Sequence, residues 1–286
     1  MEKLLNGKFV ASSIIRDAKN EAGKLRRDGI IPKLKIVRVG ERKDSIAYEN
    51  AIIKRMDEAN IETEVLALPE DIDQSNLIKE LKKLVDSSSV HGIMLFRPLP
   101  KHIDENEIKF VISPEKDVDC INPVNVAKLV EGDETGFPPC TAMAALEVLK
   151  YYKIELEGKE AVVIGRSMVV GKPLSMLLLR GNSTVTVCHS KTKNLSKVTK
   201  RADILVAAIG QPQMIKKEYL KDGAIVIDVG INVDSSGKIT GDVDTQDCLD
   251  KVQFITPVPS GVGSVTTAVL AKHVIKACKL VNRTVR

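Results

Sequence analysis

A glycine turn near the middle of the chain carries the clearest chemistry in the sequence. Residues 161–173 are AVVIGRSMVVGKP: an apolar run stops at Gly165, and Gly171 precedes the apolar periodicity of a helix from Leu174. This order predicts a strand, a glycine turn and a helix. Glycine permits a close backbone approach, and a helix N-terminus offers free N–H groups and partial positive charge. The stretch therefore predicts the diphosphate seat of a dinucleotide-binding unit.

The glycine spacing alone does not decide this, because the two glycines do not form G-x-G-x-x-G and an ordinary strand-to-helix turn fits equally well. The following strand, residues 184–188, ends about 20 residues past the turn, where an NAD site carries an Asp or Glu for the ribose 2′-hydroxyl. No carboxylate follows this strand. Arg166 and Ser167 in the turn, and Ser190 beside two lysines, instead suit a 2′-phosphate. The sequence predicts NADP rather than NAD.

Composition narrows the class of protein. With 286 residues, 43% hydrophobic and 28% charged, the chain is typical of a globular protein of two domains. No apolar run approaches the ~20 residues of a membrane span, and the N-terminus lacks a signal-peptide pattern, so we expect a cytoplasmic protein without membrane contact. A net charge of +5 and 3% aromatic residues argue against nucleic-acid binding.

The cysteines and histidines are scattered. The five cysteines include no C-x-x-C pair, and the four histidines do not cluster with them. We therefore expect free buried thiols, no disulfide framework and no metal site.

Helical and strand patterns alternate along the first half of the chain. Helices are expected at residues 9–27, 44–59, 74–85 and 104–112, and strands at 33–39, 62–68 and 92–96. Alternating units of this kind predict an α/β fold with a mostly parallel, doubly wound sheet.

A domain crossing is expected in the loop-like, Pro- and Gly-rich stretch 114–141. Thr141 is the expected N-cap of a linking helix over 142–152. Buried strands follow at 161–164, 184–188, 204–209, 224–229 and 252–255, and a helix at 266–281 closes the chain. The expected domains are therefore 1–140, with the last helix (266–286) packing back on it, and 141–265 as a Rossmann-like NADP domain.

Eight motifs, in order, resemble those of the methylenetetrahydrofolate dehydrogenase/cyclohydrolase family. They are YENAIIKRMDEANI, GIMLFRPLP, SPEKDVDCINPVN, FPPCT, GRSMVVGKPLSMLL, CHSKT, DVGIN and ITPVPSGVG, and they span nearly the whole chain. The resemblance implies an oxidoreductase of one-carbon metabolism that interconverts tetrahydrofolate derivatives for purine biosynthesis. It also implies two α/β domains with a folate cleft between them, a homodimer, and a cofactor site lined by Gly165, Arg166, Ser167, Ser190 and Ile231.

The folate side departs from the family pattern. The family has a Lys four residues after the helix tyrosine, whereas here Tyr48 is followed by Ile52. A Gln that normally precedes Pro-Leu-Pro by two residues is Phe96. Lys54 lies about 200° around the helix from Ile52 at ~100° per residue, so Arg55 is the nearest cation on the face of Tyr48. Asp119 is kept and, by resemblance, binds the guanidine-like edge of the pterin.

Several neighbouring positions also differ from the family. The Gly that normally follows Asp119 is Cys120, Ala142 and Ala144 replace Pro and Gly, and the closing loop carries Ser260 and Ser264. The substitutions gather on the folate side, while the cofactor side is intact.

The two family reactions make different demands. Hydride transfer from 5,10-methylenetetrahydrofolate to NADP needs the rings held at near-attack distance but no proton transfer. Hydrolysis of the methenyl product needs a polar group with a tuned pKa, such as a desolvated lysine. Ile52 and Phe96 remove that polar pair together.

Four hypotheses follow. The leading one is an NADP-dependent methylenetetrahydrofolate dehydrogenase, with Tyr48 and Asp119 orienting folate and the cyclohydrolase step in question. One alternative is a multifunctional enzyme that keeps both the dehydrogenase and the cyclohydrolase activity, the latter through Arg55 or an ordered water. Another is a non-catalytic NADP-binding paralogue, and the last, disfavoured by PVPSGVG and FPPCT, is a Rossmann dehydrogenase for a different substrate.

Overall fold

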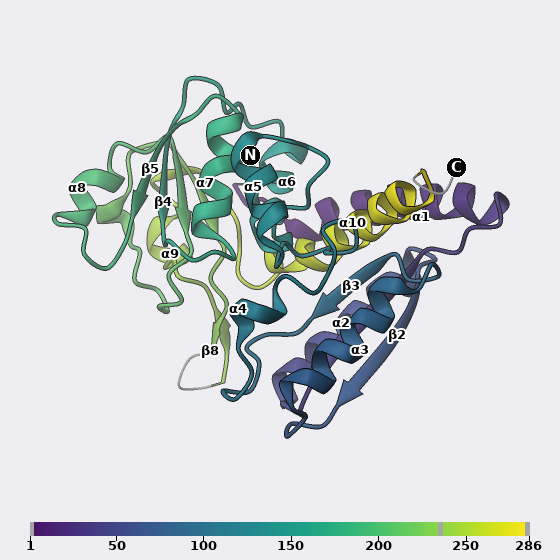
Figure 1. Ribbon diagram of the computed structural model, residues 1–286. Helices are drawn as coiled ribbons and strands as arrows, with labels where there is room; N and C mark the ends of the chain where they lie inside the picture. Colours follow the sequence, from purple (N-terminus) through teal and green to yellow (C-terminus); the bar gives the residue numbers. More distant parts are fainter. Residues whose placement is uncertain (1–2, 234–236, 284–286) are drawn as a thin grey trace. The chain divides into compact units, whose positions relative to one another are not determined.

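The chain divides into two compact units, each described by itself below (Figure 1). The computed structural model describes residues 3–233 and 237–283. Unit 1 contains the residues up to Ala11 and Thr141–Thr266, and unit 2 contains Ser12–Cys140 and the residues from Thr267 on. The chain passes between the units within three helices, α1 (Gly7–Arg27), α6 (Cys140–Tyr151) and α10 (Gly263–Arg283).

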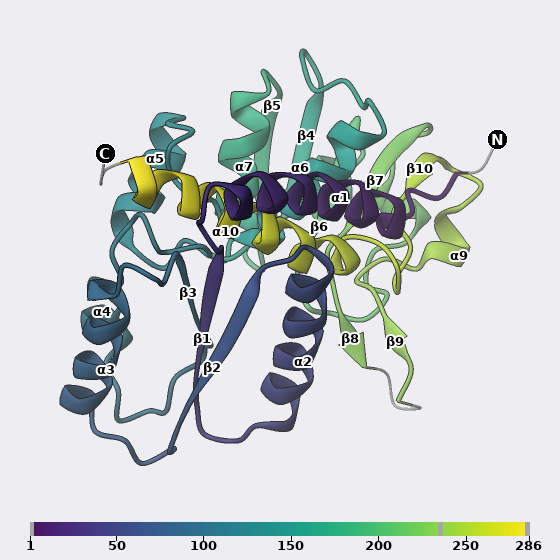
Figure 2. The same ribbon diagram turned by 90° about the vertical axis from the view of Figure 1, so that its right-hand side faces the viewer.

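Unit 2 is built on a parallel three-stranded sheet with the order β2-β1-β3. Its elements are β1 (Lys33–Val39), α2 (Lys43–Glu58), β2 (Glu62–Leu68), α3 (Gln74–Asp86), β3 (Gly92–Leu95), α4 (Glu105–Ile108) and α5 (Pro123–Glu131). The crossover from β1 to β2 runs in the opposite direction to that from β2 to β3. Right-handed crossovers then place α2 and α3 on opposite sides of the strands, as Figure 2 shows.

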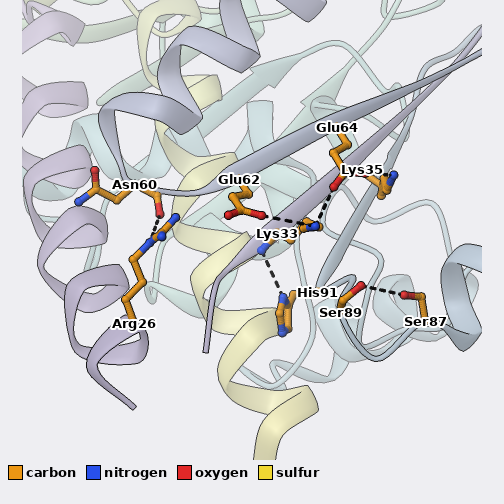
Figure 3. Close-up of polar contacts among 9 residues, drawn as sticks. All are labelled: Arg26, Lys33, Lys35, Asn60, Glu62, Glu64, Ser87, Ser89 and His91. Carbon is orange, nitrogen blue, oxygen red and sulfur yellow. Dashed lines mark hydrogen bonds and ion pairs between the residues drawn. The ribbon is translucent and has the colours of Figure 1, made fainter. Parts of the chain in front are cut away.

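Cross-strand ion pairs line one side of β1 and β2 (Figure 3). Lys33 Nζ lies 3.4 Å from Glu62 and 2.7 Å from Glu64, and Lys35 also pairs with Glu64. Hydrogen bonds from the two lysines lower the pKa of Glu64 to about 2. Because Lys33 is the register partner of Glu62 and Lys35 that of Glu64, the pairs support the parallel register.

Unit 1 is built on a parallel five-stranded sheet with the order β10-β7-β6-β4-β5, and a separate antiparallel pair β8-β9. Its elements are β4 (Glu160–Ile164), α7 (Gly171–Arg180), β5 (Thr184–Cys188), α8 (Leu195–Thr199), β6 (Ile204–Ala207), the 3-10 turn η1 (Lys217–Tyr219), β7 (Ala224–Asp228), β8 (Asn232–Val233), β9 (Ile239–Thr240), α9 (Thr245–Cys248) and β10 (Val252–Ile255). All four residues of the central strand β6 are buried, which explains its unbroken apolar sequence.

The predicted mostly parallel, doubly wound α/β class is confirmed, and three elements differ from expectation. The helix expected at 104–112 is a single turn, α4, and α5 lies inside the stretch expected to be loop. Helix α6 begins at Cys140, so Thr141 lies inside the helix and is not its N-cap. Among the helices in the described ranges, none combines the length and apolarity needed to cross a membrane.

Candidate functional site

The turn predicted to bind the cofactor contains two glycines that have no room for a side chain. Gly165 follows β4 with φ +128°, and a Cβ there would lie 2.2 Å from the carbonyl oxygen of Ala208, directly after β6. A Cβ on Gly171, the first residue of α7, would lie 2.1 Å from the carbonyl oxygen of Gly165. The end of β4, the turn and the start of α7 therefore lie in close backbone contact, which a close approach to a diphosphate requires.

The sheet order places this turn where open α/β sheets bind ligands. From β4 the chain first forms β5 on one side and then β6 on the other, so the strand order reverses between β4 and β6. Gly165 and Ala208 follow these two strands. Ligands of doubly wound sheets bind outside the carboxyl ends of the strands at such a switch point.

The predicted cofactor side chains are available around the turn. Arg166, Ser167 and Ser190 are exposed, and Ser167 Oγ accepts the N–H of Val170 at 3.1 Å. Within the described ranges, neither Arg166 nor Ser190 has a hydrogen-bonding or ionic side-chain partner. The Gly165 N–H donates to the carbonyl of Cys188 at 2.9 Å, which brings the end of β5, and so Ser190, beside the turn.

Ile231 belongs to a different strand end. It lies in the loop after β7, and its side chain is 63% exposed. A Cβ on Gly263 would lie 2.9 Å from Ile231 Cδ1, so the start of α10 approaches this side chain closely.

In unit 2, the positions expected on the folate side form a buried apolar cluster beside one tyrosine. Tyr48 and Ile52 lie one turn apart on α2, where Tyr48 is half-buried and Ile52 fully buried. The ring of Phe96, directly after β3, lies 5.6 Å from the ring of Tyr48 at an interplanar angle of 32°. Burial raises the pKa of the Tyr48 phenol, so the hydroxyl stays neutral. The positions of the family's lysine and glutamine therefore carry hydrocarbon.

Asp119 is held by the start of a helix. Its Oδ1 accepts the backbone N–H of Cys140, the first residue of α6, at 2.9 Å. Burial raises the pKa of Asp119 to about 6, against the lowering effects of Cys140 and of the positive charge of Arg97. The carboxylate is mainly ionised at neutral pH and suits a cationic or N–H-rich ligand.

Two neutral groups support the segment that carries Asp119. The Cys140 thiol donates to the carbonyl of Val118 at 3.4 Å, and His273 Nδ1 donates to the same carbonyl at 2.9 Å. Burial raises the pKa of Cys140 and lowers that of His273 to about 4. The thiol stays protonated at neutral pH and so supplies no thiolate, and both side chains brace the backbone at Val118.

The structure also places the two cations that follow Tyr48 on α2 and that were considered from the sequence. Lys54 is exposed, and Arg55 pairs with Glu58 at 2.7 Å. A surface hollow of about 700 Å³ is lined by Lys54 and other residues of α1, α2 and β2, but by neither Tyr48 nor Asp119. In the described part of the chain, no cluster of three or more acidic, His or Cys side chains is arranged to hold a metal ion.

One residue at this site was not singled out from the sequence. Arg97, between Phe96 and Pro98, is exposed, and it makes no ion pair or hydrogen bond with any residue of the described ranges, yet its charge acts on both Asp119 and Cys120. The signal was present in the sequence as a cation placed directly after a buried strand. Its proximity to Asp119 depends on tertiary structure.

A parallel sheet with a glycine seat at its switch point defines a Rossmann-type nucleotide-binding protein. The sequence also matches two family profiles, "Tetrahydrofolate dehydrogenase/cyclohydrolase, catalytic domain" over residues 5–119 and "Tetrahydrofolate dehydrogenase/cyclohydrolase, NAD(P)-binding domain" over residues 139–282. The chain belongs to the tetrahydrofolate dehydrogenase/cyclohydrolase family.

Individual relatives agree over the full length. The chain is 58% identical over 280 residues to the bifunctional protein FolD of Clostridioides difficile, covering 98% of each chain. The solved bifunctional methylenetetrahydrofolate dehydrogenase/cyclohydrolase of Campylobacter jejuni superposes with a TM-score of 0.95 at 42% identity, covering 98% of this chain and 99% of that one. The Trypanosoma brucei enzyme, solved with NADP and an inhibitor, gives a TM-score of 0.92 at 35% identity over 100% of both chains.

Proposed function

We propose that this protein oxidises 5,10-methylenetetrahydrofolate to the 5,10-methenyl form with NADP, and that it hydrolyses the methenyl product weakly or not at all. The observation that carries the proposal is the Gly165 turn at the switch point of unit 1, with exposed Arg166 and Ser190 around it and no carboxylate at the end of β5. Unit 2 supplies the folate side through Tyr48 and Asp119. NADP, when bound, provides the hydride acceptor.

The chain's own residues act by binding and orientation. Asp119 Oδ1 is occupied by the Cys140 N–H, so the substrate's guanidine-like edge meets the other carboxylate oxygen. The half-buried ring of Tyr48, packed against the tilted ring of buried Phe96, offers an aromatic contact for the folate. Hydride transfer between held rings needs this positioning and no proton relay.

The positions of the family's lysine and glutamine provide no acid or base for the hydrolytic step. Ile52 is fully buried and Phe96 is apolar, so no side chain at either position can remove or deliver a proton. Arg55, the cation considered from the sequence, is engaged with Glu58. A bifunctional enzyme remains the second candidate, because the C. difficile relative at 58% identity is named as bifunctional.

An absorbance assay separates the two reactions. Purified protein with methylenetetrahydrofolate and NADP is expected to produce the methenyl absorbance, and its absence contradicts the dehydrogenase. Decay of added methenyltetrahydrofolate is expected to match the buffer rate, and faster decay identifies the bifunctional enzyme.

The variant Ile52→Lys with Phe96→Gln tests the cause of the missing step. Restored methenyl hydrolysis is the expected result, because a lysine in this buried position has a lowered pKa. The control is Ile52→Met with Phe96→Leu, which changes packing without adding a polar group. Failure of a folded, NADP-binding lysine variant contradicts this account.

Cofactor choice rests on Arg166. Arg166→Ala is expected to raise the Michaelis constant for NADP about tenfold or more, because charge-assisted hydrogen bonds to phosphate contribute about 1.5–3 kcal/mol. The Michaelis constant for NAD is expected to change little. Equal effects on the two cofactors contradict a 2′-phosphate contact, and Lys200→Ala, at an exposed cation that precedes β6, serves as the comparison.

We also propose a cytoplasmic homodimer. Strand β2 is at the edge of its sheet, and Thr63 Oγ1 on this strand is buried without a hydrogen-bond partner in the described chain. An unpaired strand edge favours pairing with a second copy. Ile53→Arg, in the hollow beside Thr63, is expected to weaken the dimer in sedimentation experiments, whereas Phe110→Arg is not.

The state of the cysteines supports the proposed cytoplasmic compartment. All five cysteines are free and buried, as expected in a reducing environment. Cell fractionation tests this placement.

A further inference from the structure

Two buried carboxylates in unit 1 hold the loops at the carboxyl edge of its sheet. Asp228 is the last residue of β7, and Asp242 follows β9. Their relative exposures are 1% and 0%. Burying a carboxylate costs free energy unless its oxygens are hydrogen-bonded. The hydrogen-bond partners of the two aspartates therefore indicate which segments of the chain they stabilise.

Asp242 is enclosed by the segment that follows β6. Its Oδ2 accepts the N–H groups of Ile209 at 2.6 Å and Gly210 at 3.1 Å, and its Oδ1 accepts the N–H of Gln211 at 2.9 Å. Three successive backbone N–H groups that converge on one anion form a nest of the kind that elsewhere binds phosphate. In this chain the anion in the nest is internal.

The same carboxylate also reaches the loop after β7. Asp242 Oδ1 accepts the side-chain N–H of Asn232 at 2.9 Å. Asp228 Oδ1 accepts the N–H of Gly230 at 2.9 Å. Ile231, the exposed residue expected at the cofactor, lies between these two anchored neighbours.

The two carboxylates are also tied to each other's segments. Asp228 accepts the backbone N–H groups of Asp242 at 3.0 Å and Val243 at 2.9 Å. A Cβ on Gly241 would lie 1.9 Å from Asp228 Oδ2, and one on Gly230 would lie 2.3 Å from the Asp242 carboxyl carbon. Each aspartate therefore packs against a glycine beside the other, and neither glycine has room for a side chain.

We propose that Asp228 and Asp242 are positioning residues for the nicotinamide half of the cofactor, acting through the Ile209–Gln211 and Gly230–Asn232 segments. The inference rests on the proposed dehydrogenase function. The diphosphate seat follows β4 and the 2′-phosphate site follows β5, so the dinucleotide must extend across the switch point toward β6 and β7. Those are the strand ends that the two aspartates fix.

The test measures NADP and NAD affinity by titration calorimetry without folate. Asp242→Asn turns an acceptor oxygen into an NH₂ group that faces backbone N–H donors or Asn232. It is expected to weaken both cofactors by a similar factor, about tenfold. This distinguishes it from Arg166→Ala, which acts mainly on NADP.

Asp203→Asn is the matched control. Asp203 directly precedes β6, at the opposite end of the strand from Ile209, and accepts the N–H of Glu160 at 2.9 Å and Lys221 Nζ at 2.6 Å. Its replacement removes a carboxylate from the same sheet and is expected to lower the melting temperature while leaving both cofactor affinities within twofold of wild type.

A second variant keeps the test decisive if Asp242→Asn does not fold. Asn232→Ala removes one side-chain bond and leaves the three backbone N–H groups on Asp242, so the fold is kept, and a roughly threefold loss of both affinities is expected. Unchanged affinities in Asn232→Ala and in folded Asp242→Asn overturn the inference alone. A wild-type protein that binds no NADP overturns the proposed function and this inference together.

Discussion

The charge at position 97 illustrates what single residues contribute to this site. Arg97 has no ionic or hydrogen-bonding partner within the described ranges, but it lowers the pKa of Asp119 against the raising effect of burial. Asp119 was predicted from its motif, whereas the influence of Arg97 on it follows from the fold. The same holds for the contact of Phe96 with Tyr48: the substitution at position 96 was visible in the sequence, and the contact between the two rings was not.

Removal of Arg97 is therefore expected to shift a pH profile. In Arg97→Leu the pKa of Asp119 rises above about 6, so ionised Asp119, and with it folate binding, is lost at higher pH than in the wild type. The acidic limb of kcat/KM for methylenetetrahydrofolate is expected to move up by about 0.7 pH units, as for a charge interaction of about 1 kcal/mol. Lys101→Leu is the control, and identical profiles for Arg97→Leu and wild type contradict the expectation.

Among the secondary-structure elements, long helices and strands with a clear apolar periodicity were predictable. Short helices that depend on capping residues were not. Helix α5 was expected to be loop because its flanks contain Pro and Gly. In the structure these are helix signals: Asn122 Oδ1 accepts the N–H of Val124 at 2.8 Å, Pro123 occupies the first turn, and Gly132 ends the helix with φ +76°. Helix α6 starts one residue before the predicted N-cap because Asp119, 21 residues earlier, accepts the N–H of Cys140.

The closing loop contains a strained residue beside an unstrained one. Ser260 has φ +77°, a conformation that costs a non-glycine residue about 1–2 kcal/mol, whereas Ser264 lies in the first turn of α10. Ser260→Gly is expected to raise the free energy of unfolding by about 0.5–1 kcal/mol after the entropy of glycine in the unfolded chain is subtracted. Ser264→Gly is expected to lower it by about 0.5 kcal/mol.

Urea unfolding of the two serine variants provides the measurement. Changes of the same sign in both variants contradict the assignment of strain to Ser260. Cys120, with φ +62°, also has a left-handed backbone and stands where the family normally has Gly, but its thiol is buried, so lost packing obscures the gain.

For the whole molecule, the parallel α/β class was predictable because β4, β6 and β7 are mainly apolar runs, as is typical of strands in a sheet covered on both faces. Acid sensitivity was not predictable, because it depends on which histidines are buried. His91 Nδ1 accepts the backbone N–H of Lys33 at 3.2 Å (Figure 3). Burial, with Lys116 and Lys33, lowers the pKa of His91 to about 4, and burial lowers that of His273 similarly.

These histidines favour folding above pH 6.5, and their contribution is lost as the pH falls toward 4, because the unfolded chain takes up the protons first. The raised pKa values of Asp119 and Asp228, about 6 and about 7, act in the opposite direction in this range. A single histidine is therefore best isolated by a variant and not by the stability curve of the wild type.

His91→Gln is expected to destabilise the protein at pH 7.5 and to lose that disadvantage on acidification. The gap in unfolding free energy between wild type and variant is expected to move by about 2–3 kcal/mol in favour of the variant between pH 7 and pH 4.5. Thermal or urea unfolding across this range provides the measurement. A gap that stays constant with pH shows that His91 takes up its proton equally in both states.

The cramped contact among Gly165, Gly171 and Ala208 has an evolutionary consequence. Any side chain on either glycine collides with a carbonyl oxygen, so mutation cannot remodel the seat gradually. Arg166 and Ser190 are exposed beside that seat, so a different side chain at either position meets no such collision. Substitutions at positions 166 and 190 can therefore change the preference between NADP and NAD during evolution, while the backbone of the glycine turn stays the same.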